Sequence, residues 1–208
     1  DALPILGQIF ITSMITGLGI VSVTSNTLAV TAEAITYMPA FGLSVAATTL
    51  VAQSLGAAKK RLAEKYAKAC IISGLVFMTI MGVVLYFSSE ALISIFSDDP
   101  EVIELGGKIL KIEAFAQPAS GLAMIVTGVL RGAKDTSGPF IVSLVGMWCV
   151  RIPLAYILLK TTSLGLVCAW IAMVADLTAR GVLSFILYTR GKWKNRILVK
   201  EPVERETA

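Results

Sequence analysis

The sequence has 208 residues, of which 56% are hydrophobic and 15% are charged; its net charge is +4 and its mean hydropathy is +0.80. A soluble domain usually has about 25% charged residues, so this composition argues against a soluble domain and favours a membrane protein. The sequence contains no histidine, which excludes histidine-based metal, acid–base and triad chemistry. It also contains no phosphate-binding glycine loop followed by Lys-Ser/Thr. We therefore expect neither an enzyme nor a bound cofactor or metal.

Six apolar windows are long enough to cross a bilayer core, which takes roughly 20 helical residues. In chain order they lie at 3–23, 27–55, 69–89, 109–130, 139–159 and 164–189. These runs do not alternate between apolar and polar residues, which favours helices over a β-barrel. The sequence thus predicts an all-α polytopic membrane protein, with a six-transmembrane-helix bundle over 1–190 and a basic tail over 191–208.

Basic residues concentrate in three segments, 59–68, 131–134 and 190–205, which hold thirteen of the eighteen Lys and Arg residues. Six spans would place all three segments on one side of the membrane. The opposite side would carry the acidic stretch 98–104. The positive-inside rule then places the basic segments and the C-terminus in the cytoplasm, with the helices in the lipid of a plasma (inner) membrane. A topological role explains these charges, so we expect no nucleic-acid partner.

Proline interrupts three of the predicted helices. Pro39 precedes Gly42 in the second window, Pro118 precedes Gly121 in the fourth, and Pro153 lies in the fifth. Each proline removes a backbone donor and is expected to kink or open its helix. Interrupted helices that line a cavity recur in secondary transporters, although proline is also common in membrane helices generally. We interpret these positions as structural hinges beside a solvated central cavity.

Several blocks of the sequence resemble patterns of the multidrug and toxic compound extrusion (MATE) family, and they follow the order of the family. The first block spans 33–57 and contains YMPAFGLSVAATTLVAQSLGA. The second combines 117–118 with 128–136, which is GVLRGAKDT. The third, 148–156, is WCVRIPLAY and is similar to the eleventh helix of the family. The segment 191–193 resembles the end of the C-terminal half.

The resemblance implies a two-lobe transporter of twelve helices, of which this chain matches the C-terminal lobe, helices seven to twelve. Family members export organic cations, drugs and other amphipathic xenobiotics in exchange for protons or sodium ions. The resemblance therefore implies antiport by alternating access. It also implies that the cavity is completed by an N-terminal lobe of the same protein or by a second copy. The first helix is shorter than a typical helix seven, so we expect the chain to be truncated there.

The sequence departs from the family pattern at one site. Some members bind the coupling cation in the C-terminal lobe through a Glu on helix seven and an Asp on helix ten. The window matching helix seven has no acid after Asp1, and the position of the helix-ten acid falls on Ser120. The resemblance thus implies that this cation site is absent here.

Ionisable side chains inside a membrane helix cost a few kcal/mol and usually face a cavity or a partner. Glu33 is a candidate for carrying protons or neutralising a cationic substrate; the alternative is a structural carboxylate. Arg151 is expected to pair with an acid such as Glu33, or to bind the substrate. For Glu113 the sequence favours an interfacial ion pair with Lys108 or Lys111.

Asp176 and Arg180 are spaced to face each other on one helix, so we expect a local ion pair. Other side chains near the prolines are candidates for the substrate or cation pathway, with ordinary helix packing as the alternative. Aromatic and thioether groups suit loosely specified lipophilic cations. These further candidates are Tyr37, Met38, Phe41, Gln117 and Ser120.

Two other functions remain open from the sequence. The chain could belong to a related flippase that moves lipid-linked sugars, which would require more charge along the cavity. It could instead be a non-transporting membrane assembly partner, which Ser120 and the short first helix would fit.

Overall fold

The computed structural model describes residues 2–162 and 164–195, and all regular structure in these residues is helical. Four helices lie in the first half of the chain: α1 (Ala2–Thr16), α2 (Ile20–Gly56), α3 (Lys60–Ser94) and α4 (Pro100–Ala114). The second half contains α5 (Gln117–Gly132), α6 (Ser137–Val145), the π-helix η1 (Gly146–Arg151), α7 (Ile152–Thr161), α8 (Leu166–Thr189) and the 3₁₀ helix η2 (Lys192–Asn195).

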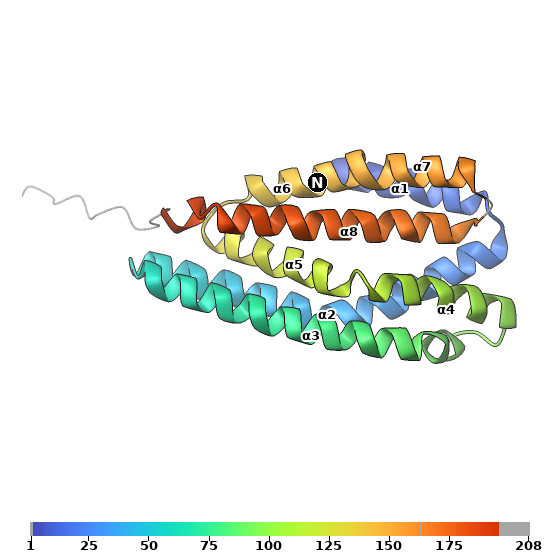
Figure 1. Ribbon diagram of the computed structural model, residues 1–208, viewed down its shortest axis with the longest axis horizontal. Helices are drawn as coiled ribbons and strands as arrows, with labels where there is room; N and C mark the ends of the chain where they lie inside the picture. Colours follow the sequence, from blue (N-terminus) through green and yellow to red (C-terminus); the bar gives the residue numbers. More distant parts are fainter. Residues whose placement is uncertain (1, 163, 196–208) are drawn as a thin grey trace, which may run out of the picture.

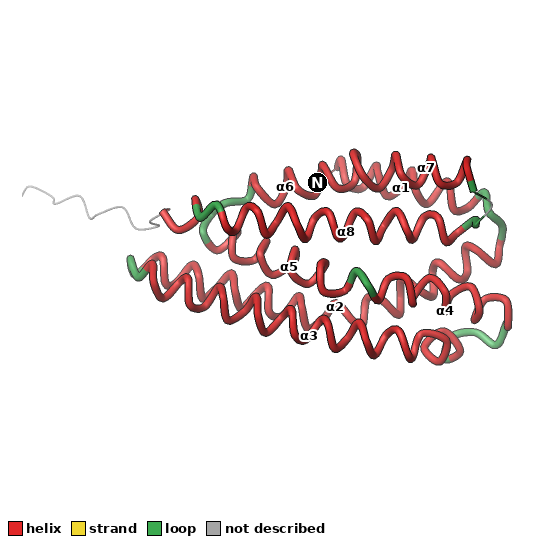
Figure 2. Tube along the Cα trace, viewed as in Figure 1, coloured by secondary structure: helices red, strands yellow, loops and turns green. Residues whose placement is uncertain are grey.

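The helices run back and forth along one long axis and form an elongated bundle (Figure 1). Short loops join them at the two ends and, between α4 and α5, in the middle of the bundle, as Figure 2 shows in green. Four helical stretches in the described residues are long and apolar enough to cross a membrane, and the pair α4–α5 makes a fifth if it counts as one bent span. α1 is a shorter apolar helix and is not in this count, which uses length and composition alone.

The first two predicted windows have the wrong boundary. The window 3–23 contains a turn: α1 ends at Thr16 and α2 begins at Ile20, well before residue 27. Gly19 has a φ of 98°, which favours glycine, and the N–H of Leu18 donates to the carbonyl of Ile15 to close the turn. Hydropathy does not reveal this turn because apolar residues continue through it.

The fourth window is also not one helix. α4 and α5 meet at a bend of 56°, and Pro118 lies in the first turn of α5. Proline is tolerated there because a first-turn N–H has no intrahelical partner. The start of α4 is fixed by Asp99, whose side chain accepts a hydrogen bond of 3.0 Å from the N–H of Glu101. The span thus consists of two separately started helices.

The other two prolines have different local settings. Pro153 lies in the first turn of α7, directly after the π-helix η1, so the fifth window is a continuous span with a widened turn in its middle. Pro39 lies inside α2, which continues as a single helix from Ile20 to Gly56. The helix does not open at Pro39, because its 37 residues continue on both sides of the proline, and the expected kink there stays a prediction.

Two apolar clusters fill the bundle, one toward each end. The first includes Leu85, Ile109 and Trp170, and the second includes Val51 and Val129. Between them α2, α4, α5 and α8 bury polar side chains that belong to neither cluster. We call this set the polar layer; its members are Glu33, Thr36, Glu113, Gln117, Ser120 and Asp176.

Glycines let α5 pack closely on α2. A Cβ at Gly128 would collide with the backbone of Ser44, and one at Gly132 would collide with that of Thr48. The hydroxyl of Ser44 donates to the carbonyl of Met124 at 2.8 Å, and that of Thr48 lies 2.9 Å from the carbonyl oxygen of Gly128. This small-residue seam is the usual means of close helix packing in membranes.

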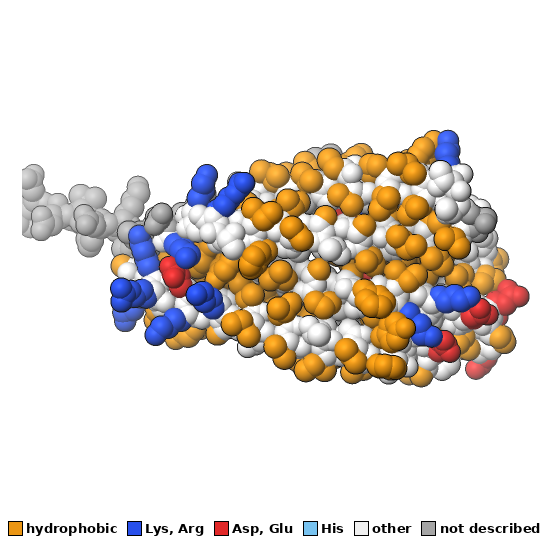
Figure 3. All heavy atoms as spheres, in the orientation of Figure 1, with side chains coloured by type: hydrophobic (Ala, Val, Ile, Leu, Met, Phe, Trp, Pro, Cys, Tyr) orange, Lys and Arg blue, Asp and Glu red, His pale blue; other side chains and the backbone are white. Residues whose placement is uncertain are grey.

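The two ends of the bundle differ in charge. Figure 3 shows Lys and Arg side chains gathered at the end of the bundle that carries η2, whereas acidic side chains gather at the other end. At the basic end, Trp193 is buried and stacks on Tyr188, and Lys194 pairs with Glu64 at 3.3 Å. Most of the predicted tail, 196–208, lies outside the described residues.

Candidate functional site

The centre of the polar layer is a pair of acids joined by one phenol. The hydroxyl of Tyr37 lies 2.6 Å from Oε1 of Glu33, one turn earlier on α2, and 2.8 Å from Oε1 of Glu113 on α4. Glu33 is 7% exposed and Glu113 is fully buried. Oε2 of Glu113 is buried without any hydrogen-bond partner. Two carboxyl groups from different helices therefore share one hydroxyl in the interior of the bundle.

A second group extends the polar layer across the bend between α4 and α5. The amide nitrogen of Gln117 donates to the hydroxyl of Thr36 at 3.1 Å, and the hydroxyl of Ser120 donates to the carbonyl of Gln117 at 3.0 Å. Oε1 of Gln117 is buried and has no partner. The first turn of α5 begins one turn after Glu113. It is the positive end of the helix dipole and favours negative charge near Glu113.

On the other side of the bundle, an ion pair on α8 lies beside Arg151. Nε of Arg180 is 2.6 Å from Asp176, a bidentate contact that confirms the expected local pair. Gly146 on η1 packs directly against this pair, where a Cβ would collide with it. Nε of Arg151 is buried and unpartnered. No ion pair within 4.0 Å joins Arg151 to Glu33 in the described part of the chain, although both act electrostatically on each other.

Some of these groups line an open cavity of about 440 Å³ between α2, α5, α6 and α8. Its charged lining residues are Glu33, Arg131, Arg151 and Arg180, and Tyr37 lines it beside Glu33. Apolar walls come from both sides; they include Phe41, Met124, Val142, Met173 and Leu177. The cavity therefore combines a few charged groups with an adaptable apolar surface, as small-molecule sites commonly do.

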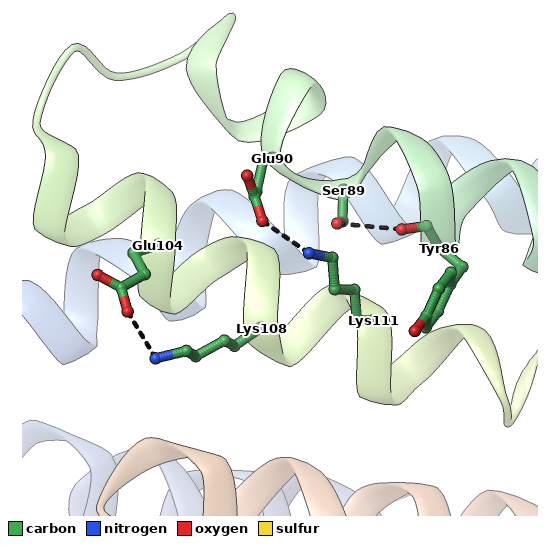
Figure 4. Close-up of polar contacts among 6 residues, drawn as sticks. All are labelled: Tyr86, Ser89, Glu90, Glu104, Lys108 and Lys111. Atoms are coloured by element: carbon green, nitrogen blue, oxygen red, sulfur yellow. Dashed lines mark hydrogen bonds and ion pairs between the residues drawn. The ribbon is translucent and has the colours of Figure 1, made fainter.

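The predicted partners of Glu113 are wrong. Lys108 contacts Glu104 at 2.6 Å, and Lys111 contacts Glu90 at 2.6 Å, as Figure 4 shows. Both lysines lie on the exposed face of α4, whereas Glu113 lies on its buried face. The buried face follows helical spacing through Val102, Gly106, Ile109, Leu110 and Glu113. That periodicity is the signal in the sequence that could have placed Glu113 inside the bundle.

The other predicted pathway residues fall into two groups. Glu33, Tyr37, Phe41, Ser120 and Arg151 line the cavity, and Gln117 is buried in the polar layer. Met38 is 68% exposed and does not line it.

Among the predicted hinge positions, Gly42 has open space beside it and Gly121 packs against Met78. The sequence prediction missed Thr36, Glu113 and Arg180 as members of the site. Within the described residues, no group of three or more Cys, Asp or Glu side chains could hold a metal ion.

A bundle of membrane-length helices with buried charges beside an open cavity defines a polytopic membrane protein of the transporter type. The MatE family model matches residues 2–157, so the chain belongs to the MatE family. The Probable multidrug resistance protein NorM of Thermotoga maritima is 34% identical over 178 residues, which cover 85% of this chain and 38% of that protein. The named relatives are transport proteins and not enzymes.

Two further comparisons agree with this assignment. Multidrug resistance protein MdtK of Yersinia pseudotuberculosis is 28% identical over 193 residues, which cover 91% of this chain and 41% of MdtK. The Vibrio cholerae MATE transporter VcmN in its bent form has the same fold, with a TM-score of 0.82 at 16% identity over 91% of this chain and 43% of VcmN. The chain thus spans about two fifths of the length of these relatives.

Proposed function

We propose that this chain is the C-terminal lobe of a secondary active antiporter that exports organic cations and other amphipathic compounds in exchange for protons or sodium ions. The observation that carries this proposal is the cavity between α2, α5, α6 and α8, because it brings a buried acid, Glu33, beside apolar and aromatic walls. A lipophilic cation gains from both, through its charge and through contacts with groups such as Phe41 and Met173.

The charges around the cavity support a cationic substrate. Arg180 is neutralised by Asp176, and Arg151 is close enough to act on both Glu33 and Glu113. The remaining cation, Arg131, lies at the last turn of α5 toward the basic end. An organic cation that enters the middle of the bundle therefore lies among acids that can balance its charge.

The cavity is open, so the proposal includes a second lobe that covers it. That lobe is the N-terminal half of the same protein or a second copy of this chain, and the two would rock against each other in lipid. We further propose that the basic end and the C-terminus face the cytoplasm of a plasma membrane, since Lys and Arg gather there (Figure 3).

The first test is transport by the full protein that contains this lobe, reconstituted in vesicles. A proton or sodium gradient should drive export of a fluorescent lipophilic cation, and Glu33→Gln should reduce it. Glu90→Gln, which changes an exposed acid of α3, is the matched control. The native mass supports the same test: a mass near twice the 22.1 kDa of this chain fits the two-lobe arrangement. Wild-type protein that moves no organic cation under either gradient would contradict the proposal.

A second candidate is a flippase for lipid-linked sugars, which carry phosphate. The observation that favours it is the presence of three arginines, Arg131, Arg151 and Arg180, in the lining of the cavity. We rank it lower because Asp176 occupies Arg180 bidentately. Transport of a phosphate-bearing amphipath, with no transport of an organic cation, would reverse this order.

A further inference from the structure

The polar layer contains two buried acids that cannot both be ionised in the observed geometry. A neutral phenol has one proton and can donate it to one carboxylate only. Tyr37 nevertheless lies within hydrogen-bond distance of both Glu33, at 2.6 Å, and Glu113, at 2.8 Å. If both acids were ionised, one of these contacts would bring two oxygen lone pairs together. The second contact is therefore a carboxylic acid donating its own proton to the phenol oxygen.

We propose that Glu33, Tyr37 and Glu113 form a proton-binding site in which the two carboxyl groups hold one proton between them, and that this proton is the coupling ion of the transporter. The site takes up a proton when one carboxylate becomes a carboxylic acid, and it returns to two carboxylates when that O–H bond breaks. The coupling role rests on the transport function proposed above, whereas the proton site does not.

The charge balance of the polar layer supports a single proton. Arg151 on η1 acts on the two acids, and the pair Asp176 and Arg180 on α8 acts in turn on Arg151. α2 contributes Tyr37 besides Glu33, α5 contributes only uncharged members, Gln117 and Ser120, and the described part of α3 brings no charged side chain into the layer. With one proton on the acids, the whole set is electrically neutral. Loss of that proton leaves one uncompensated negative charge, which is costly inside a membrane protein.

This charge balance explains how a proton can be exchanged for a substrate cation. A monovalent organic cation that enters the cavity beside Glu33 neutralises the negative charge, so the proton can leave without a net charge remaining. When the cation departs, the acids take up a proton again. Each state of the cycle then carries at most one uncompensated charge. This is the physical condition for coupling a proton to a cationic substrate.

The same geometry disfavours sodium at this position. Oε1 of Glu33 and Oε1 of Glu113 are both in contact with the phenol of Tyr37. Oε2 of Glu113 and Oε1 of Gln117 remain free acceptors, and both are fully buried. A sodium ion would have to displace the phenol to bind both Oε1 atoms. Proton binding needs no such rearrangement.

Infrared spectroscopy of the full-length protein in lipid tests the site without any transport assay. At neutral pH the wild type should show the carbonyl stretch of a protonated carboxylic acid. Glu113→Gln and Glu33→Gln should each remove it, while Glu90→Gln, at an exposed ion pair, should retain it. An unchanged band in both interior variants, or a wild-type band that disappears on adding sodium at constant pH, would overturn the proton site.

Transport in vesicles tests the coupling. Glu113→Gln should reduce proton-driven export of a lipophilic cation about tenfold or more, since its charge can no longer change. Thermal unfolding close to that of the wild type would show that the variant is folded, and Glu90→Gln, at an exposed ion pair outside the site, should keep its export. Tyr37→Phe, which keeps both acids, should weaken proton coupling without abolishing it. Retained proton-driven export in Glu113→Gln would overturn the coupling role.

The two proposals fail in distinguishable ways. Wild-type protein that exports no organic cation but shows the carboxylic acid band in the infrared contradicts the proposed function and leaves the proton site supported. Wild-type export that follows a sodium gradient and ignores a proton gradient supports the function and overturns the coupling ion.

Discussion

Two acids of α4, Glu104 and Glu113, lie on the same helix and are used in opposite ways. Glu104 is at the acidic end of the bundle, where Lys108 neutralises it from the next turn in contact with solvent (Figure 4). Glu113 is fully buried, has no cation in direct contact, and shares the phenol of Tyr37 with Glu33. Exposed acids can be neutralised by any flexible cation. A buried acid must be neutralised by groups held in fixed positions, and a proton that neutralises it can then be exchanged.

The largest expected effect comes from breaking the interior ion pair of Asp176 and Arg180. Asp176→Ala leaves Arg180 without its bidentate partner and Arg151 without its nearest acid on α8. Breaking a buried pair on one side typically costs about 3–5 kcal/mol. We expect a loss of this order in the free energy of unfolding, measured by denaturant titration in mixed micelles. The double variant Asp176→Ala/Arg180→Ala should lose less; an equal or larger loss would indicate that packing and not charge decides the effect.

The next largest effect tests whether packing around the polar layer matters as much as its charges. Gly128→Ala would push a methyl group into the backbone of Ser44, so we expect a loss of about 1–3 kcal/mol in the free energy of unfolding. Gly42→Ala on α2 is the control, because nothing lies within 4 Å of its Cβ position. A helical Gly→Ala change without a clash usually stabilises by about 0.5–1 kcal/mol. Equal effects at the two glycines would show that α2 and α5 do not pack as described.

A smaller effect is expected for the shared phenol. Tyr37→Phe removes one hydroxyl that serves two acids, so we expect a loss of about 1–2 kcal/mol in the free energy of unfolding. The loss should be greatest at a pH where one of the acids is ionised, because only then does the hydroxyl donate to a carboxylate. Tyr86→Phe, at a partly exposed tyrosine of α3, is the control and should change little. Equal losses in the free energy of unfolding for the two tyrosine variants would contradict the role of Tyr37 in the polar layer.

The smallest effect is expected for the exposed acid Glu104. Glu104→Gln removes an ion pair whose two side chains are 60% and 70% exposed, so we expect no measurable change in unfolding and none in transport. Added salt should change the stability of this variant and of the wild type equally, because screening already weakens such an exposed pair. If Glu104→Gln proved as damaging as Tyr37→Phe, the distinction between the end of the bundle and its middle would not hold.

The sequence predicted the helical membrane bundle and several members of the site, because long apolar runs and isolated charges inside them are strong signals. It also predicted the pair Asp176–Arg180, since i,i+4 spacing fixes contact within one helix. It failed where contact depends on how helices rotate against each other. Glu113 has two lysines nearby in the sequence, yet helical rotation places it on the opposite face. The turn at Gly19 was missed because apolar residues flank it on both sides.

The bend between α4 and α5 has one more consequence, for local motion. At the bend the N–H groups of Phe115 and Ala116 bond to the carbonyls of Ile112 and Glu113, one residue closer than in a regular helix. Pro118 has no N–H to add. Amide hydrogens in the middle of this span should therefore exchange with deuterium sooner than those in the middle of α3, reversing the usual order in which helix ends exchange first. Such opening would give water brief access to Glu113 while the rest of the bundle stays closed.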